Sequence, residues 1–209
     1  LLKLVETLYI DELSTDMLRA FEPHQVGCGA PDGAPLIVYT ARSWADNLRA
    51  KAQPAAEDRE EVIAGIDLEK NAYGRAYRSA CLRGCRKRLP RVAALAATEW
   101  RLGTTTVWQR ADGLWRMSQA SRGGWQGSRL MQVMFAMGME EALDQVPQLQ
   151  CRAAYQDDAC FFAKAAHITD NWPRLSCELE RAGHRMREPS ARSGHLCAMG
   201  CPLPSCRQP

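Results

Sequence analysis

Three acidic residues stand where apolar segments of the sequence end. Asp67 follows the apolar run 62–66, and Asp157 and Asp158 lie at the centre of the apolar stretch 151–163. The flanks of that stretch predict two strands joined by a tight turn. Carboxylates in such places are costly unless a cation compensates them, and Mg²⁺ prefers oxygen ligands. The three aspartates are therefore candidate catalytic metal ligands, although an Asp-Asp pair by itself most often caps a turn.

The elements that would position these residues follow from the hydrophobic pattern. Helical spacing predicts helices over residues 1–18, 36–50, 73–88, 91–99, 129–145 and 168–182. A strand is expected over 61–68, and Ala111-Asp112-Gly113 predicts a hairpin between the β-prone runs 104–108 and 114–118. The glycine- and proline-rich segment 21–35 is expected to be a loop. This order predicts an α+β fold in which helices back a small antiparallel sheet.

Positive charge is concentrated in the middle of the chain. Residues 70–130 hold thirteen Lys and Arg and only two acids, whereas residues 1–69 hold six bases and thirteen acids. Such a block is typical of a surface that binds a polyanion such as a nucleic acid. A helix face that is simply exposed to solvent explains the charge equally well. Stacking on nucleotides is one role for the aromatic residues within the block, but core packing is expected for most of Tyr73, Tyr77, Trp100, Trp108, Trp115 and Trp125.

Composition excludes other classes of protein. The longest charge-free apolar stretch, 130–139, is about half a bilayer span, so neither a membrane-spanning helix nor a membrane partner is expected. An odd number of cysteines, nine, and the lack of a basic-then-apolar leader favour reduced thiols. We therefore predict an intracellular protein, nuclear or cytoplasmic and not secreted. Cys81 and Cys85, one helical turn apart, are expected to pack in the core rather than to bind metal.

Several segments together resemble the motifs of one enzyme family. Tyr155-Gln156-Asp157-Asp158 resembles the Tyr-x-Asp-Asp box, motif C, of reverse transcriptases. Residues 122–128 resemble motif B, with Ser128 as a predicted helix N-cap. Ile66 to Tyr73 is similar to motif A of the non-LTR retrotransposon enzymes, and residues 23–27 resemble the segment joining fingers to palm. The motifs stand in the family's order, and the resemblance spans about residues 18–196.

The resemblance implies the palm of an RNA-directed DNA polymerase, a nucleotidyltransferase that uses two Mg²⁺ ions, with Mn²⁺ as an alternative. Its partners would be an RNA template, a DNA primer and deoxynucleoside triphosphates. It further implies a division into partial fingers over 1–60, a palm over 61–196 and an unpatterned tail over 197–209, with no thumb. Composition does not give the oligomeric state.

The resemblance also assigns roles to residues. The metal ligands would be Asp67, Asp157, Asp158 and the backbone carbonyl of Leu68. Tyr73 would lie under the incoming sugar and exclude a 2′-hydroxyl, while Gln126 and Gly127 would contact the template and the nucleotide. The basic block would line a nucleic-acid groove through Arg75, Arg78, Arg83 and Arg122.

The sequence departs from the family pattern in three ways. Five residues rather than four separate Asp67 from the aromatic residue, which is expected to shift Tyr73 around the start of its helix. No Lys follows Gly183, where motif D usually supplies one, and only Arg185, Arg187 and Arg192 are basic. No motif E or thumb follows residue 196. Two alternatives therefore stay open: an inactive relic or nucleic-acid-binding protein with the palm fold, and an unrelated basic nucleic-acid-binding module.

Overall fold

The computed structural model describes residues 2–50, 61–101, 103–125, 127–149 and 152–187. Its helices are α1 (Leu2–Glu12), α2 (Ser14–Phe21), α3 (Gly33–Ala50), α4 (Ala72–Arg75), α5 (Arg78–Arg88), α6 (Pro90–Arg101), α7 (Arg129–Leu143), the 3₁₀ turn η2 (Pro147–Leu149) and α8 (Ala165–Arg181). Its strands are β1 (Glu61–Ile66), β2 (Thr104–Gln109), β3 (Trp115–Ala120), β4 (Arg152–Tyr155) and β5 (Asp158–Lys164). The predicted α+β class, with a small antiparallel sheet backed by helices, is confirmed. The tail 197–209 lies outside the described residues.

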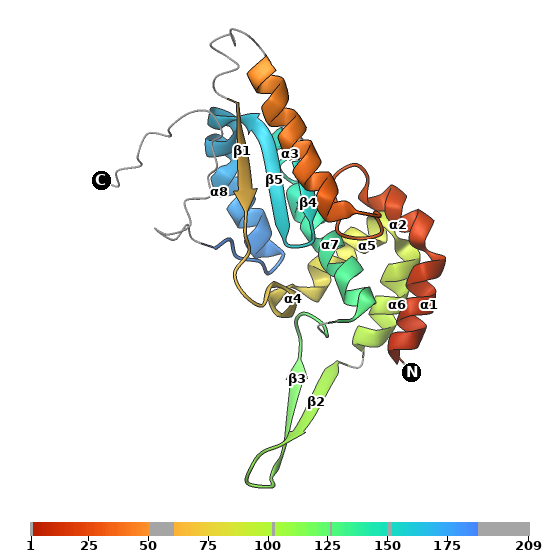
Figure 1. Cartoon of the computed structure of the whole chain (residues 1–209). Helices are drawn as coiled ribbons and strands as arrows, with labels where there is room; N and C mark the ends of the chain where they lie inside the picture. Colours follow the sequence, from red (N-terminus) through yellow and green to blue (C-terminus); the bar gives the residue numbers. More distant parts are fainter. Residues whose placement is uncertain (1, 51–60, 102, 126, 150–151, 188–209) are drawn as a thin grey trace, which may run out of the picture.

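Strands β1, β5 and β4 form an antiparallel sheet in that order. Ile66 at the end of β1 pairs with Ala159 of β5, and Tyr155 at the end of β4 pairs with Asp158. Strand β1 therefore ends at the same end of the sheet as the β4–β5 turn, and α4 lies beside this end (Figure 1). The predicted strand and the predicted tight turn are brought to the same end of one sheet.

Helices cover both faces of this sheet. Successive side chains of β5 point to opposite faces, so each face receives apolar side chains from this strand. Ala159 and Phe161 belong to the main core, together with Leu175 and Leu179 of α8. Phe162 faces the other way, and its ring lies 5.4 Å from that of Trp44 in α3. The strand consequently reads as an apolar run with no polar face.

Helices α5 and α7 pack against each other closely enough to require a glycine. A Cβ added at Gly84 of α5 would lie 2.3 Å from the carbonyl oxygen of Met137 in α7, so only glycine fits. Cys81 and Cys85 are buried in this contact, and the Cys85 thiol lies 3.1 Å from the sulfur of Met134. Burial raises the pKa of the Cys81 thiol to about 12. The expectation that these cysteines pack in the core is confirmed.

The β2–β3 hairpin projects away from the rest of the molecule (Figure 1). Trp108 and Trp115 of this hairpin are 45% and 67% exposed, and Trp125 beyond it is 51% exposed. The expectation of core packing for most of the aromatic residues was therefore wrong for these three. Tyr73, Tyr77 and Trp100 do pack against the core.

The predicted helix over 73–88 is divided in two. Ala76 leaves helical geometry, and its carbonyl accepts a hydrogen bond of 2.8 Å from the N–H of Gly123. The next N–H, of Tyr77, donates to the carbonyl of Ala182 at 2.9 Å. Bonds to two distant segments thus replace the helical ladder at this point.

Membrane-spanning helices and the state of the cysteines are the two features on which the expected compartment depends. In the described part of the chain, no helix is long and apolar enough to cross a lipid bilayer. The five cysteines that the structure describes are free thiols. The compartment itself stays a prediction.

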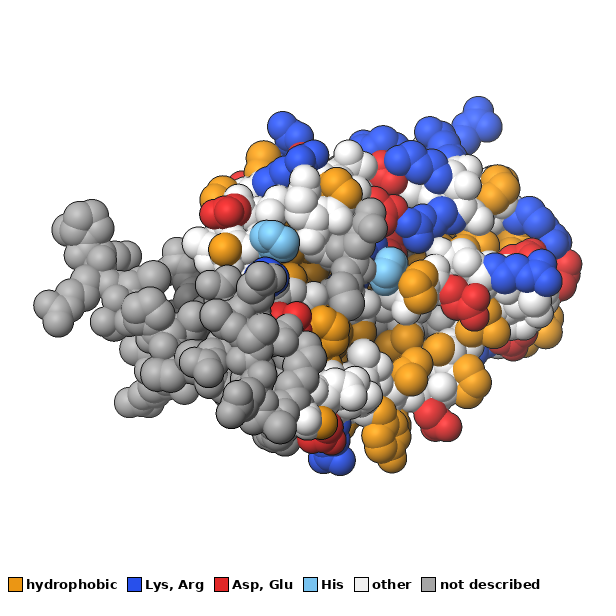
Figure 2. All heavy atoms as spheres, turned by 90° about the horizontal axis from the view of Figure 1, so that it is seen from above, with side chains coloured by type: hydrophobic (Ala, Val, Ile, Leu, Met, Phe, Trp, Pro, Cys, Tyr) orange, Lys and Arg blue, Asp and Glu red, His pale blue; other side chains and the backbone are white. Residues whose placement is uncertain are grey.

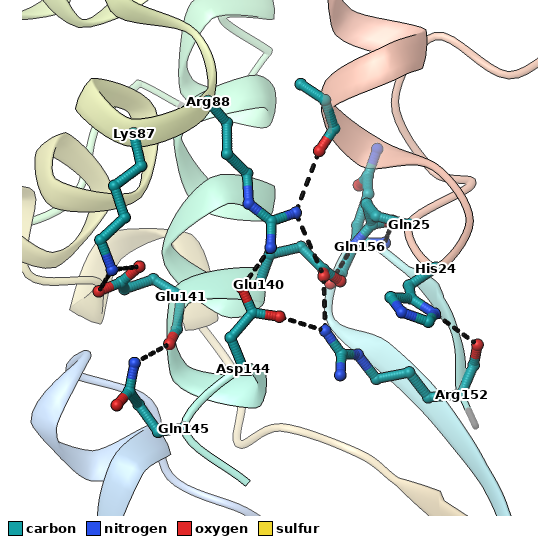
Figure 3. Close-up of polar contacts among 11 residues, drawn as sticks. His24, Gln25, Lys87, Arg88, Glu140, Glu141, Asp144, Gln145, Arg152 and Gln156 are labelled. Carbon is teal, nitrogen blue, oxygen red and sulfur yellow. Dashed lines mark hydrogen bonds and ion pairs between the residues drawn. The ribbon is translucent and has the colours of Figure 1, made fainter. Parts of the chain in front are cut away.

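A buried ion pair joins α7 to β4 (Figure 3). Arg152 and Glu140 have side chains 1% and 0% exposed, and a guanidinium nitrogen of Arg152 lies 2.8 Å from Glu140 Oε2. Arg152 also donates to Asp144 at 2.7 Å. Arg88 of α5 adds a second guanidinium. It pairs with Glu140 and Asp144 and also donates to the carbonyl of Ala20 at the end of α2.

We predict that Glu140→Ala lowers the free energy of unfolding by about 3 kcal/mol, because it leaves the Arg152 charge poorly compensated in the core. The neighbouring Glu141→Ala, which breaks a pair with the exposed Lys87, is expected to cost less than about 1 kcal/mol. Urea unfolding of both variants checks this. Equal costs for the two substitutions would contradict the assignment.

Candidate active site

The three candidate aspartates converge at one end of the sheet. Asp67 directly follows Ile66, which pairs with Ala159, and Asp158 directly precedes Ala159 on the partner strand. Partial burial raises the pKa of Asp158, and the nearby charges of Asp157 and Asp67 raise it further. The strand register thus brings the three aspartates to the same end of the sheet, where a bound cation would lessen the repulsion between like charges.

Asp67 is also held by the chain that follows α8. The N–H of Arg187 donates to the carbonyl of Asp67 at 2.8 Å, and Leu68 forms an antiparallel bridge with Met186. The guanidinium of Arg187 donates to the Asp67 carboxylate at 3.1 Å, in a pair whose two side chains are each 56% exposed. The segment that follows α8 therefore contributes an arginine, Arg187, to the end of the sheet where Asp67 lies.

The donor types at this end of the sheet suit a hard divalent cation, since all three side chains are carboxylates. The part of the chain that the structure describes nevertheless contains no group of three or more His, Cys, Asp or Glu side chains placed to hold a metal ion. One of the three carboxylates, that of Asp67, is instead paired with the Arg187 guanidinium. The metal ligands, including the Leu68 carbonyl, stay a prediction.

Tyr73 lies beside the β4–β5 turn. Its hydroxyl donates to Oε1 of Gln156, and its ring stacks on Phe135 of α7 at 4.3 Å between centroids. Burial and the charge of Asp157 raise the pKa of Tyr73. Asn71 adopts a left-handed conformation, with φ 66°, immediately before α4 begins at Ala72. Tyr73 is thus the second residue of α4, and its hydroxyl reaches the β4–β5 turn.

The segment before α7 meets the same region. Ser128 accepts a hydrogen bond from the N–H of Met131 at 3.0 Å, so the predicted N-cap of α7 is confirmed. The Ser128 hydroxyl donates to Glu6 of α1 at 2.8 Å. Gly127 is exposed, and Gln126 lies outside the described residues. The nucleotide-contact roles of both stay predictions.

Three of the four candidate nucleic-acid-binding arginines lie around the junction between α4 and α5. Arg78 donates to the carbonyl of Gly123 at 2.8 Å and to Thr104 at 2.6 Å, and Arg122 lies 4.7 Å above the Tyr77 ring. Arg75 pairs with Glu69. Arg83 lies apart from them, beside α7 and α8. The structure therefore brings three of these residues together and not the fourth.

Much of the basic block is neutralised by acidic side chains from neighbouring elements. These ion pairs are Arg75–Glu69, Lys87–Glu141, Arg88–Asp144, Arg91–Glu12, Arg110–Asp112 and Arg129–Asp11. Seen from above, Lys and Arg side chains gather along one side of the molecule with acidic side chains among them (Figure 2). The net charge of the block thus overstates what it presents to a polyanion.

Two residues at the site have no role predicted from the sequence. Gln25, within the segment 23–27 that resembles the join of fingers to palm, hydrogen-bonds to the backbone of Gln156. His184, which follows Gly183, is 1% exposed, and its ring lies 4.9 Å from Phe135, on which Tyr73 stacks. The resemblance marks the segment of Gln25 but not its contact with the turn, and a single His after a helix carries no sequence pattern.

Comparison with known proteins gives no family model that matches the chain and no match among curated proteins. Among solved structures, the chain is similar to telomerase from Candida albicans in complex with a TWJ fragment of telomeric RNA, with a TM-score of 0.63 and 12% identity over 84% of this chain and 33% of that one. Apo telomerase from Candida tropicalis gives a TM-score of 0.59 at 10% identity, over 88% of this chain and 35% of that one. The chain thus spans about a third of the telomerase chains that it matches.

At these identities the likeness shows the fold, and that fold is the one found in telomerase, a polymerase related to the reverse transcriptases. The third similar structure, Candida tropicalis telomerase with a TWJ fragment of telomeric RNA, has a TM-score of 0.54 at 11% identity, over 88% of this chain and 31% of that one. The structural likeness supports a reverse-transcriptase-like fold. It does not distinguish the non-LTR type from others.

Burial of His184 is expected to make the free energy of unfolding depend on pH. Neither ring nitrogen has a hydrogen-bond partner among the described residues, and burial lowers the pKa of His184 to about 4. The unfolded chain, with an ordinary histidine pKa near 6.5, binds this proton more readily than the folded one. We expect this residue to remove about 3 kcal/mol of stability as the pH falls from about 6.5 to about 4.

The measurement is urea unfolding of the wild type and His184→Leu at several pH values. The variant is expected to lose less stability than the wild type across that window. His167→Leu, at an exposed position of α8, serves as the matched control and is expected to follow the wild type. Parallel pH profiles for the wild type and His184→Leu would contradict the prediction.

Proposed function

We propose that this chain is the palm-centred part of an RNA-directed DNA polymerase of a non-LTR retrotransposon. The observation that carries the proposal is the meeting of Asp67, from the end of β1, with Asp157 and Asp158, from the β4–β5 turn. This meeting occurs in a fold that resembles telomerase, and the retrotransposon type rests on the motif resemblance alone.

In the proposed reaction, the primer 3′-hydroxyl attacks the α-phosphate of a deoxynucleoside triphosphate, the bond between the α- and β-phosphates breaks, and pyrophosphate and the hydroxyl proton are released. A bound pair of Mg²⁺ or Mn²⁺ ions supplies activation of that hydroxyl and charge stabilisation at the phosphate. Asp67, Asp157, Asp158 and the Leu68 carbonyl would hold the ions. Tyr73, packed on Phe135, would place its ring under the incoming sugar, where a 2′-hydroxyl is excluded. Gln126 and Gly127 would contact template and nucleotide.

The proposed partners are an RNA template, a DNA primer and deoxynucleoside triphosphates. Two of the similar telomerase structures contain a fragment of telomeric RNA, which supports RNA as one partner of this chain. Arg122, which is exposed and lies over the Tyr77 ring at the junction between α4 and α5, would contact the phosphate backbone of a bound nucleic acid.

A second candidate function is nucleic-acid binding by an inactive protein with the same fold. The ion pair between Arg187 and Asp67 favours it, because a carboxylate bound to a guanidinium is not free to bind a cation. The two candidates agree on nucleic-acid binding and differ on whether the aspartates support incorporation.

Primer extension on an RNA template with Mg²⁺ separates the two candidates. The wild type is expected to incorporate deoxynucleotides, and Asp157→Asn is expected to reduce incorporation by more than about 100-fold, since even outer partners of metal ligands are worth about 10–100-fold. Asp170→Asn, at an exposed position of α8, is the matched control and keeps wild-type incorporation. Folded wild-type protein without incorporation would overturn the polymerase proposal and leave nucleic-acid binding.

Both candidates predict a contribution of Arg122 to binding. In a titration of an RNA–DNA duplex at several salt concentrations, Arg122→Gln is expected to reduce the slope of log K against log [salt] by about 0.9, the value for one phosphate contact. Arg91→Gln, which removes a guanidinium already paired with Glu12, is expected to leave the slope unchanged. An unchanged slope for Arg122→Gln would exclude this phosphate contact.

A further inference from the structure

A segment near the N-terminus runs beside the strand that leads to the aspartates. Residues 24–27 form a parallel pairing with β4, centred on Gln25 and Ala154. The N–H of Val26 donates to the carbonyl of Ala154 at 2.8 Å, and the N–H of Ala154 donates to the carbonyl of His24 at 2.7 Å. This pairing fixes the segment against the strand whose next residues form the β4–β5 turn.

The side chain of Gln25 hydrogen-bonds to the backbone of that turn. It is 2% exposed, and its Oε1 accepts hydrogen bonds from the N–H of Gln156 at 2.8 Å and from the N–H of Gly27 at 2.9 Å. Its Nε2 lies 3.5 Å from the carbonyl oxygen of Gln156. Figure 3 shows the two glutamines side by side. One buried amide thus contacts both backbone polar groups of the residue that precedes Asp157.

Gln156 needs such a support because of its backbone conformation. Its φ is 56°, in the left-handed region that non-glycine residues adopt only when their surroundings hold them there. Gly27 closes over the turn from the same side: a Cβ added there would lie 2.6 Å from the nitrogen of Gln156. The close approach of residues 25–27 therefore requires a glycine and fixes the turn through its backbone.

The same turn residue holds Tyr73 through its side chain. Oε1 of Gln156 accepts the hydrogen bond of the Tyr73 hydroxyl, and its Nε2 donates to the carbonyl of Gly27 at 3.3 Å. A continuous chain of hydrogen bonds runs from the N-terminal segment through the turn to the tyrosine. Displacement of Gln156 would move the adjacent Asp157 and release Tyr73 together.

We propose that Gln25 is a positioning residue for Asp157 and Asp158: it fixes the left-handed Gln156 and thereby sets where the two carboxylates stand against Asp67. The catalytic part of this inference rests on the proposed polymerase function, whereas the structural part does not. Gln25 contacts the turn and not the substrate, so its loss is expected to change the chemical step rather than the binding of template.

The test compares Gln25→Met, which keeps the length of the side chain and removes its acceptor, with Gln25→Glu, which keeps an oxygen acceptor for the two N–H groups. Gln145→Met is the matched control, since the exposed Gln145 side chain also bonds to a backbone carbonyl, but within another element. Amide hydrogen exchange at Gln156 is measured on folded protein without substrate. Exchange is expected to rise about tenfold in Gln25→Met and to stay near wild type in Gln25→Glu and Gln145→Met.

The second readout is primer extension. In Gln25→Met, kcat is expected to fall tenfold or more while KM for the template–primer stays unchanged. If Gln25→Met does not fold, Gly27→Ala acts on the same contact and is expected to give the same kcat loss. Wild-type exchange at Gln156 together with wild-type kcat in Gln25→Met would overturn the positioning role.

Failure of the polymerase function is recognised separately. The wild-type protein then shows no incorporation that Asp157→Asn abolishes, and substitutions at Gln25 do not change this result. In that case hydrogen exchange still decides the structural part: a slow Gln156 amide in Gln25→Met would show that the glutamine does not hold the turn.

Discussion

The fully buried ion pair between Glu140 and Arg152 is the constraint on which the arrangement of this molecule depends. Two charges removed from water are held together only in close geometry, and this 2.8 Å pair ties β4 to α7, with Glu140 Oε1 and Arg152 Nε buried without a hydrogen-bond partner among the described residues. The backbone carbonyl oxygen of Arg152 also lies 3.4 Å from Nδ1 of His24, in the segment that pairs with β4. Helix α7, strand β4 and the N-terminal segment thus all contact Arg152, and Asp157 lies five residues after it in the chain.

Local pattern was sufficient to predict the elements and the place of the aspartates. Apolar runs that end in Asp67 and flank Asp157 indicated strands with carboxylates at their ends, and the N-cap at Ser128 and the β2–β3 hairpin were set by residues near one another in the chain. The resemblance of the motifs then indicated that the two strand ends would meet. The register of β1 on β5 brings them together as that expectation requires.

Contacts between distant residues could not be predicted in this way. Gln25 and Gln156 are 131 positions apart, and Asp67 and Arg187 are 120 apart, so no periodicity relates them. The tryptophans of the hairpin were expected in the core because residue type was weighed without the knowledge that the hairpin stands away from the body. The net charge of the basic block likewise did not indicate its exposed charge, since five of the six acidic partners, all but Asp112, come from outside residues 70–130.

The proposed function requires Asp67, Asp157 and Asp158 to bind divalent cations although Asp67 is paired with Arg187. Anomalous X-ray diffraction from crystals soaked in Mn²⁺ tests this binding. We expect Mn²⁺ bound by Asp67, Asp157 and Asp158, with the Arg187 guanidinium displaced from Asp67. Crystals that show no Mn²⁺ at this end of the sheet, with the ion pair intact, would contradict it.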